Sequence, residues 1–369
     1  MKIGVVVEPY EEEHTSGISY AIMSQAAGML NMDAENEYIF YTHTPIDSNR
    51  FAGNFKNVLV PKSFVGKNAW FIFTSIFRKK EISDVLIFNM PLLPLVVPRS
   101  IRTIPIFYEL SAYREPGVRV SPRVVLAHVY KLLEKTAVRR SSRIVTASVG
   151  VQKELIDFFG LDEKKVSVVY NGFQKFKGNP ETLSKFSNQR GHFLFTGRVK
   201  YKKNVHNIVE GFIKFRKENP LATQKLFIVG LYGGGYYENI AKKAEEVGLG
   251  KDVVFTGFVS GGDLYHLYKN ARGLVFCSLQ EGFGMPILEA MDFGVPVITS
   301  DRAPMNEVAG NAAIVVDPEN VSQIADAMKT IVFDVRKREE LIRRGKSRAG
   351  EFSWEKNANE LLTIVKSIA

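Results

Sequence analysis

The chain is 369 residues long, with 45% hydrophobic and 24% charged side chains, a composition that argues against disordered, collagen-like and membrane-spanning classes. That length allows two domains with full hydrophobic cores. The net charge of +10 predicts attraction to an anionic partner, and because the basic residues are scattered without interleaved aromatic residues, we expect phosphate-bearing substrates or an anionic membrane surface rather than nucleic acid.

The N-terminus and the cysteine content both favour a cytoplasmic location. Met1-Lys2 leads directly into a strand-like apolar run, which leaves no room for a signal peptide. Cys277 is the single cysteine, so a disulfide framework is excluded. No apolar run approaches the roughly eighteen residues that a membrane-spanning helix needs. We therefore expect a cytoplasmic protein, peripheral at most to the inner face of a membrane.

The first half of the chain alternates short apolar runs rich in β-branched residues with amphipathic segments, a pattern typical of a parallel sheet covered by helices. Its predicted strands are 2–7, 37–42, 84–88, 102–107, 143–147 and 166–169. After the first of them, Gly17 would let a loop approach a ligand, and His14 beside it is a candidate for acceptor contact. A plain strand-to-helix connection explains this segment about as well.

A second series of the same kind fills the rest of the chain, with predicted strands at 192–196, 225–229, 253–256, 273–276, 296–299 and 312–316. Between the two series, Asn171-Gly172 breaks the chain, and the polar segment 178–190 is typical of a linker. We therefore predict a first domain at 1–177, a second at 178–350 and a final helix within 351–369 that could pack on either domain, the first included.

The carboxyl ends of these strands are where a ligand is expected. In open α/β sheets, ligands collect beyond that edge, so two such domains facing each other would make one interdomain cleft. The strand at 192–196 is followed by Gly197-Arg198 and then by Lys203. A glycine there allows a sharp turn, and Arg198 with Lys203 can place two positive charges on a diphosphate. A solvated basic loop is the alternative.

The stretch 281–289, Glu-Gly-Phe-Gly-Met-Pro-Ile-Leu-Glu, is the most informative. Pro286 suits the first turn of a helix that Gly294 could close, so the two glycines before it sit at a helix N-terminus, which favours a negatively charged oxygen. Glu281 would reach out of the loop, and Glu289, roughly one turn into the helix, would point towards the same place from behind. An anion between two carboxylates suggests a sugar nucleotide.

Together these motifs resemble those of the retaining glycosyltransferases of family 4, the glycosyl transferases group 1, which have the GT-B fold of two Rossmann-like, doubly wound parallel-sheet domains. In the second half the resemblance is specific and rests on Gly197-Arg198, Lys203-Asn204, the Glu-x7-Glu element, Pro296-Val297-Ile298-Thr299-Ser300, Glu307-Val308, Asp317-Pro318 and Phe352-Ser353-Trp354-Glu355. In the first half it is thinner, and rests on Ser16-Gly17, Thr146-Ala147-Ser148 and Val169-Tyr170-Asn171-Gly172.

The resemblance implies a role for each matching residue. Arg198 and Lys203 match the basic pair that holds the donor diphosphate and steadies the leaving phosphate. Glu289 matches the glutamate that binds the ribose hydroxyls, and Glu281 matches the one that faces the transferred sugar. The resemblance further implies donor contacts at Gly17, Gly197, Gly282, Phe283, Gly284 and Met285.

One departure from the family pattern concerns the first domain. Many relatives carry His-Asp-Leu after a strand of that domain, whereas this chain has Tyr108-Glu109-Leu110, so the histidine often placed beside the transferred sugar is absent. Tyr108 could hydrogen-bond the sugar or the acceptor, and Glu109 could orient it or act as a base. Alternatively, Glu109 only pairs with a nearby arginine such as Arg114.

The function that the resemblance implies is transfer of a hexose, mannose or glucose, from a nucleoside-diphosphate sugar to a glycan or lipid-linked acceptor. Members of the family usually need no metal, no Asp-x-Asp motif occurs, and the histidines lack metal-ligand spacing, so we expect neither a metal nor a cofactor besides the donor. The alternatives are a non-catalytic nucleotide-sugar-binding subunit and an epimerase or phosphorylase of the same fold.

One segment of the first half, 64–80, could also lie on an anionic membrane. It combines several aromatic side chains, Trp70 among them, with Arg78-Lys79-Lys80. We favour the alternative that it is a core helix of the first domain with a basic end.

Overall fold

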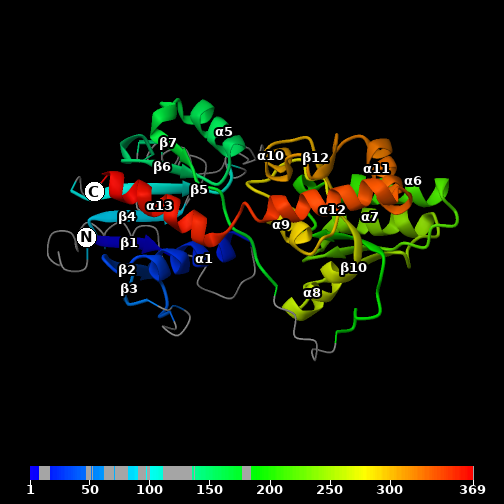
Figure 1. Cartoon of the computed structure of the whole chain (residues 1–369), viewed down its shortest axis with the longest axis horizontal. Coiled ribbons are helices and arrows are strands. Elements are labelled where there is room, and N and C mark those ends of the chain that lie inside the picture. Colours follow the sequence, from blue (N-terminus) through cyan, green and yellow to red (C-terminus); the bar gives the residue numbers. More distant parts are fainter. Residues whose placement is uncertain are drawn as a thin grey trace. The chain divides into compact units, whose positions relative to one another are not determined.

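The computed structural model of the chain divides into two compact units, each of which is described by itself (Figure 1). The first unit is Met1–Gly172 with Phe352–Ala369, and the second is Phe173–Glu351. The structure describes residues 1–7, 17–46, 51, 53–61, 70, 82–89, 97, 100–110, 135–136, 138–176 and 184–368. His14, Arg114 and the segment 64–80 apart from Trp70 lie outside these residues.

The described part of the first unit contains a seven-stranded parallel sheet in the order β3-β2-β1-β4-β5-β6-β7. Its central strands are buried along their length, as a parallel sheet with helices on its faces requires. Trp70 packs against its core, edge to face with Tyr41 at 5.8 Å between ring centroids. The strands are β1 (Lys2–Val6), β2 (Glu37–Thr42), β3 (Phe55–Leu59), β4 (Val85–Asn89), β5 (Arg102–Phe107), β6 (Ile144–Thr146) and β7 (Val166–Val168).

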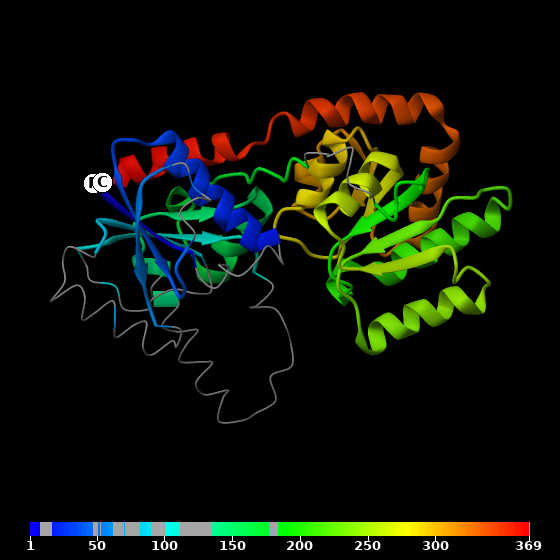
Figure 2. The ribbon, with the colours of Figure 1, turned by 90° about the horizontal axis from the view of Figure 1, so that it is seen from below.

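The last helix of the chain, α13 (Trp354–Ile368), belongs to the first unit, where it packs along α1 (Gly17–Met32). Both views show the two helices side by side (Figures 1 and 2). The Gln25 amide donates to Asn357 Oδ1 at 2.9 Å, and a Cβ on Gly28 would come within 3.0 Å of the Trp354 carbonyl oxygen. The glycine therefore lets the two helices approach closely. Other helices of this unit include α5 (Val149–Phe159) and the short η3 (Glu163–Lys165).

The second unit is built on a six-stranded parallel sheet in the order β10-β9-β8-β11-β12-β13, counted over the residues that the structure describes. The strands are β8 (His192–Thr196), β9 (Leu226–Val229), β10 (Val253–Gly257), β11 (Ala271–Phe276), β12 (Val297–Ser300) and β13 (Ala313–Val316). The helices are η4 (Tyr201–Lys203), α6 (Val205–Glu218), α7 (Gly234–Glu246), α8 (Gly261–Asn270), α9 (Met285–Asp292), α10 (Met305–Ala309), α11 (Val321–Phe333) and α12 (Val335–Ala349).

The predicted architecture of two parallel α/β sheets is confirmed. Each strand predicted from the sequence is present, with ends within two residues of the predicted ones. The strand β3 was missed, because it lies at the edge of its sheet and its sequence, Phe-Lys-Asn-Val-Leu, interrupts the apolar run with two polar residues. Within the described residues, no helix has the length and apolar character to cross a bilayer.

Candidate active site

The carboxyl ends of β8 and β9 meet at two glycines. Gly197, directly after β8, has φ of 143°, and Gly230, directly after β9, has φ of 139°. A Cβ on Gly230 would lie 2.2 Å from the Gly197 carbonyl oxygen, so only glycine allows the two chains to pass this closely. Arg198 follows as an exposed side chain that forms no ion pair with any residue the structure describes. The strand ends therefore present a cation at the edge where ligands of such sheets bind.

The second predicted cation, Lys203, is held in place by the residue that follows it. Asn204 is fully buried, has the left-handed φ of 58°, and donates through its amide to the Cys277 carbonyl at 2.9 Å and to the Pro318 carbonyl at 2.6 Å. These bonds tie the start of α6 to the segments that follow β11 and β13. Lys203 is thereby fixed at the same edge of the sheet.

Lys203 and Glu281, predicted separately, form an ion pair. Lys203 Nζ lies 2.5 Å from Glu281 Oε1 and 2.7 Å from Oε2, and 5.7 Å from the centre of the Phe276 ring. The Ser278 hydroxyl donates to Glu281 Oε1 at 2.8 Å. The side chains of Lys203 and Glu281 are 19% and 8% exposed. The cation and the carboxylate are thus paired and largely shielded from solvent.

The helix after Glu281 begins and ends as its sequence predicts. Gly284 is its N-cap with φ of 103° and ψ of 46°, a left-handed conformation that favours glycine, and Pro286 lies in its first turn. Gly294, with φ of 72°, follows its last turn. Gly282 and Phe283 are buried in the preceding loop, and Met285 is the first helical residue. The helix N-terminus therefore lies beside Glu281, with its positive dipole end there.

Glu289 is buried one turn into α9 and lies near the end of β8. It is 9% exposed, and its Oε2 accepts a hydrogen bond from the Tyr268 hydroxyl at 2.7 Å. The same hydroxyl lies 3.1 Å from Thr196 Oγ1, the last residue of β8 before Gly197. Burial raises the pKa of Glu289 to about 7, and the hydrogen bond from Tyr268 opposes that rise. All four predicted charged residues therefore belong to one edge of one unit.

The candidates in the first unit are placed separately. Gly17 is exposed at the first position of α1. Tyr108 is 6% exposed, with its hydroxyl 3.5 Å from Gln25 Oε1, and Glu109 next to it is half-buried. Their roles, and that of His14, stay predictions.

Two residues of the site were not found from the sequence. The sequence contains a weak signal for Ser278, because this residue lies three positions before Glu281, but serines in loops are common. Tyr268 has none, because the pattern of α8 is that of any helix packed on a sheet. Its partner is 21 positions away in the sequence. Only folding shows that its hydroxyl reaches a carboxylate.

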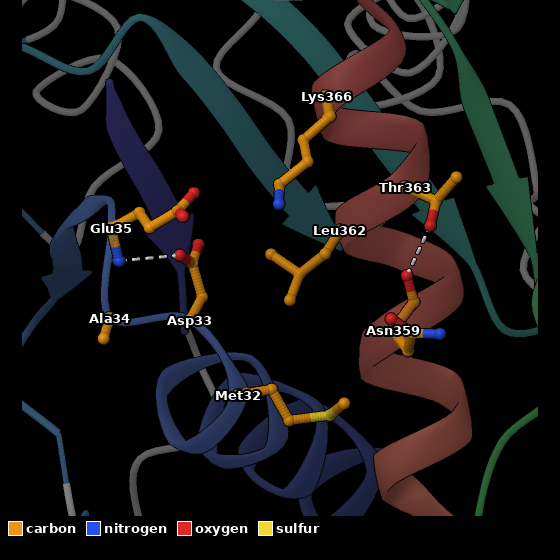
Figure 3. A pocket seen from close by; sticks show the side chains of 8 residues that line it. All are labelled: Met32, Asp33, Ala34, Glu35, Asn359, Leu362, Thr363 and Lys366. Carbon is orange, nitrogen blue, oxygen red and sulfur yellow. Dashed lines mark hydrogen bonds between the residues drawn. The ribbon is translucent and has the colours of Figure 1, made fainter.

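A separate hollow of about 330 Å³ lies in the first unit, between the end of α1 and α13 (Figure 3). It is lined by Met32, Asp33, Ala34, Glu35, Asn359, Leu362, Thr363 and Lys366. Asp33 already accepts hydrogen bonds from the Asn36 amide and the Tyr38 hydroxyl. The hollow adjoins the loop before β2, at the amino ends of the strands, which is the edge opposite to the usual ligand edge. It is therefore a less suitable site than the one in the second unit.

Comparison with known proteins identifies the part of the chain that carries this site. Residues 182–348 match the family described as Glycosyl transferases group 1. This segment, less than half of the chain, is similar to the group 1 glycosyl transferases. The predicted resemblance to that family is confirmed, and Arg198, Lys203, Glu281 and Glu289 all lie within the matched residues.

Curated proteins to which the chain is similar include glycosyltransferases. An uncharacterized glycosyltransferase of Methanocaldococcus jannaschii is 29% identical over 247 residues, which are 63% of this chain and 62% of that protein. O-antigen chain mannosyltransferase B of Escherichia coli is 32% identical over 179 residues, which are 48% of this chain and 46% of that protein. The matched part of the chain thus spans between about half and three fifths of these relatives.

The chain also shares its fold with solved structures. Anabaena HepE, in complex with UDP and glucose, is 17% identical with a TM-score of 0.76, and the similarity covers 100% of both chains. The predicted GT-B fold is confirmed by this likeness and by the two parallel sheets.

Proposed function

We propose that the chain is a retaining glycosyltransferase that moves a hexose, mannose or glucose, from a nucleoside-diphosphate sugar to a glycan or lipid-linked acceptor. The observation that carries this proposal is the paired Lys203 and Glu281 beside the N-terminus of α9 and the buried Glu289. Cations, a dipole end and two carboxylates at one edge of a parallel sheet suit a ligand that is both anionic and rich in hydroxyl groups.

The chemistry of the transfer assigns these groups different tasks. Breaking the bond between the sugar and the diphosphate leaves negative charge on the phosphate and positive character on the sugar ring. Lys203 and Arg198 stabilise the leaving diphosphate, together with the amides at the start of α9. When the phosphate contacts Lys203, the Glu281 carboxylate is freed to face the sugar. Glu289 accepts hydrogen bonds from the ribose hydroxyls of the donor.

The relatives support the choice of donor and product. A mannosyltransferase of O-antigen chains is among them, and the HepE structure contains UDP and glucose. The net charge of +10 suits an acceptor that is itself phosphorylated or lies on an anionic membrane surface. We further propose that the transfer needs no metal and no cofactor, because Arg198 and Lys203 supply the charge that a metal would otherwise supply.

Donor turnover tests the proposal. The full chain is incubated with GDP-, UDP- and ADP-sugars in excess EDTA, and release of the nucleoside diphosphate is measured. We expect release with at least one donor, and a fall of about a hundredfold or more for Lys203→Ala because a charge in contact with the leaving group is removed. Lys242→Ala is the matched control, since Lys242 is 75% exposed on α7.

The other outcomes separate the alternatives. Binding of a nucleotide sugar without turnover, even when glycan acceptors are supplied, would show a non-catalytic binding subunit. Conversion of the sugar to its epimer would show an epimerase. Turnover that stops in EDTA and returns with Mg²⁺ would contradict the metal-independent mechanism.

A further inference from the structure

Tyr268 is a buried tyrosine whose hydroxyl lies between the end of β8 and Glu289. It is 0% exposed on α8, and its ring stacks on Phe293 at 5.4 Å between centroids with an angle of 10°. Its hydroxyl lies 2.7 Å from Glu289 Oε2 and 3.1 Å from Thr196 Oγ1. The ring is fixed by packing, so the hydroxyl has a fixed position as well.

The direction of these hydrogen bonds follows from the number of protons. A tyrosine hydroxyl has one proton to donate, and an ionised carboxylate can only accept. The Tyr268 proton therefore goes to Glu289 Oε2, and Thr196 must donate to the Tyr268 oxygen. The chain of donors runs from the strand that bears Gly197 and Arg198 to the carboxylate on α9. It gives Glu289 one fixed orientation.

The other carboxylate oxygen is left open. Glu289 Oε1 accepts no hydrogen bond from any residue in the described part of the chain, and it is not among the buried polar atoms that lack a partner, so solvent reaches it. A fixed carboxylate with one occupied and one open oxygen suits two neighbouring hydroxyl groups, one on each oxygen. A phosphate would be repelled at the same place.

We propose that Tyr268 is a positioning residue that orients Glu289, and keeps it an acceptor, for the vicinal ribose hydroxyls of a nucleoside diphosphate. This inference rests on the proposed function, since it presumes that a nucleotide binds at this edge. It adds a residue, and a donor chain through Thr196, to the binding of the donor. Tyr268 does not touch the reacting atoms in this scheme.

The surroundings of Glu289 make its ionisation depend on this hydroxyl. Besides α8, the elements packed against α9 include α10, α12, β11 and β12. Charged residues on these elements include Glu307, Lys346, Arg348 and Arg272, yet burial and the Tyr268 hydrogen bond are the causes that set the pKa of Glu289. Burial favours the neutral acid and the hydrogen bond favours the carboxylate. Without the hydroxyl, the pKa of Glu289 rises further.

A thermodynamic cycle of binding affinities, which combines a protein substitution with removal of the ribose hydroxyls from the ligand, tests the positioning role. Affinities of the full chain for UDP and GDP, and for their 2′,3′-dideoxy analogues, are measured by calorimetry for the wild type and for Tyr268→Phe. We expect Tyr268→Phe to weaken binding of the ribonucleotide about tenfold at pH 7 and binding of the dideoxy analogue less than twofold. The variant loses the hydrogen bond to the Glu289 carboxylate, and only a ligand with ribose hydroxyls depends on the orientation of that carboxylate. Equal losses for both ligands would contradict the proposal.

The matched control is Tyr265→Phe, one turn earlier on α8. Tyr265 also packs on Phe293, at 5.3 Å between centroids, but its hydroxyl makes no hydrogen bond to Glu289. The Tyr265→Phe substitution should leave the affinities for both the ribonucleotide and the dideoxy analogue unchanged. Thr196→Val removes the hydrogen-bond donor to Tyr268, and it should reduce ribonucleotide affinity less than Tyr268→Phe does.

The pH profile separates positioning from a packing role. Affinity for the ribonucleotide should rise with pH as Glu289 ionises, and the midpoint of that rise should move to higher pH in Tyr268→Phe. A loss of packing alone would lower affinity at every pH without moving the midpoint, and that result would overturn the proposal.

A measurement without nucleotide keeps this inference apart from the proposed function. If the wild type binds neither UDP nor GDP, the proposed function fails for these donors. The carboxyl stretching band of Glu289, identified by its loss in Glu289→Gln, still reports the ionisation of that residue by infrared titration. An unchanged midpoint in Tyr268→Phe would then overturn the positioning role as well.

Discussion

At the scale of single residues, the charged side chains of the site differ in how they are partnered. Lys203 and Glu281 satisfy each other at 2.5 Å, and Glu289 is held by one hydroxyl in a buried place. The first pair places a cation beside an anion, which avoids the larger penalty of shielding either charge from water unpaired. Glu289 is different, because its burial makes its charged form unfavourable.

The burial of Glu289 predicts that the protein loses stability as the pH rises. Its pKa is about 7 when folded against 4.5 for the free side chain, so the folded state binds more protons than the unfolded state between these values. Below about pH 4.5 the burial of Glu289 costs no stability through its ionisation, and above about pH 7 the full cost of burying the ionised carboxylate applies. Glu289→Gln removes this cost. Between pH 5 and pH 8, the free energy of unfolding of the variant should therefore rise by about 2–3 kcal/mol relative to that of the wild type.

Urea unfolding at a series of pH values measures this difference. Glu246→Gln is the control, because it is the same substitution at a carboxylate that is 61% exposed. A Glu289→Gln curve parallel to that of the wild type would show that folding does not raise the pKa of Glu289.

At the scale of elements, glycines let chain segments meet at the sheet edge where side chains would separate them. Gly197 and Gly230 bring the ends of β8 and β9 together, and Gly284 allows the turn that starts α9. Asn204 fixes the start of α6 through its left-handed backbone conformation and the two hydrogen bonds that its side-chain amide donates. The position of the charged residues follows from these turns.

Gly230→Ala should therefore be strongly destabilising. The new Cβ would lie 2.2 Å from the Gly197 carbonyl oxygen, and φ of 139° is unfavourable for alanine. We expect a loss of about 3 kcal/mol or more in the free energy of unfolding, combined from steric overlap and backbone strain. The loop of Arg198 would shift with it.

Gly235→Ala is the matched control on the same connection. Nothing lies within 4 Å of a Cβ at this position, and the residue belongs to α7, where alanine is favoured. Thermal unfolding of both variants measures the difference. Similar melting temperatures for the two would argue against a close approach of β8 and β9.

At the scale of the whole molecule, the chain leaves the first unit once and returns to it. It passes into the second unit at Gly172–Phe173 and comes back at Glu351–Phe352, so that α13 completes the first unit. Leu361 and Val365 on this helix are fully buried, and α13 packs along α1. The stability of the first unit thus depends on the last residues of the chain.

Leu361→Ala should weaken the first unit and leave the second unchanged. Removing a fully buried leucine side chain costs about 2–5 kcal/mol. Hydrogen exchange should therefore become faster in α1 and in the sheet of the first unit, while β8 to β13 keep their protection. The exposed Lys366 on the same helix gives the control, Lys366→Ala. Faster exchange in the second unit would contradict this assignment of α13.

The sequence by itself determined the α/β class and, among the described strands, all except β3, and it named the charged residues as candidates for the site. Apolar periodicity and the placing of Gly284, Pro286 and Gly294 are local signals, and they predicted both ends of α9. The edge strand β3 was missed because its polar residues break that periodicity. Local signals also placed Arg198, Lys203, Glu281 and Glu289 at strand or helix ends.

Only the tertiary structure decided how those residues are paired. The ion pair of Lys203 with Glu281 joins positions 78 apart, and the bond of Tyr268 with Glu289 joins positions 21 apart. The contact of α13 with α1 spans most of the chain, through Gln25 and Asn357. Such contacts depend on strand order and on the exclusion of water from the site. Neither leaves a pattern in neighbouring residues, so the sequence could not indicate the raised pKa of Glu289 or the position of the Tyr268 hydroxyl.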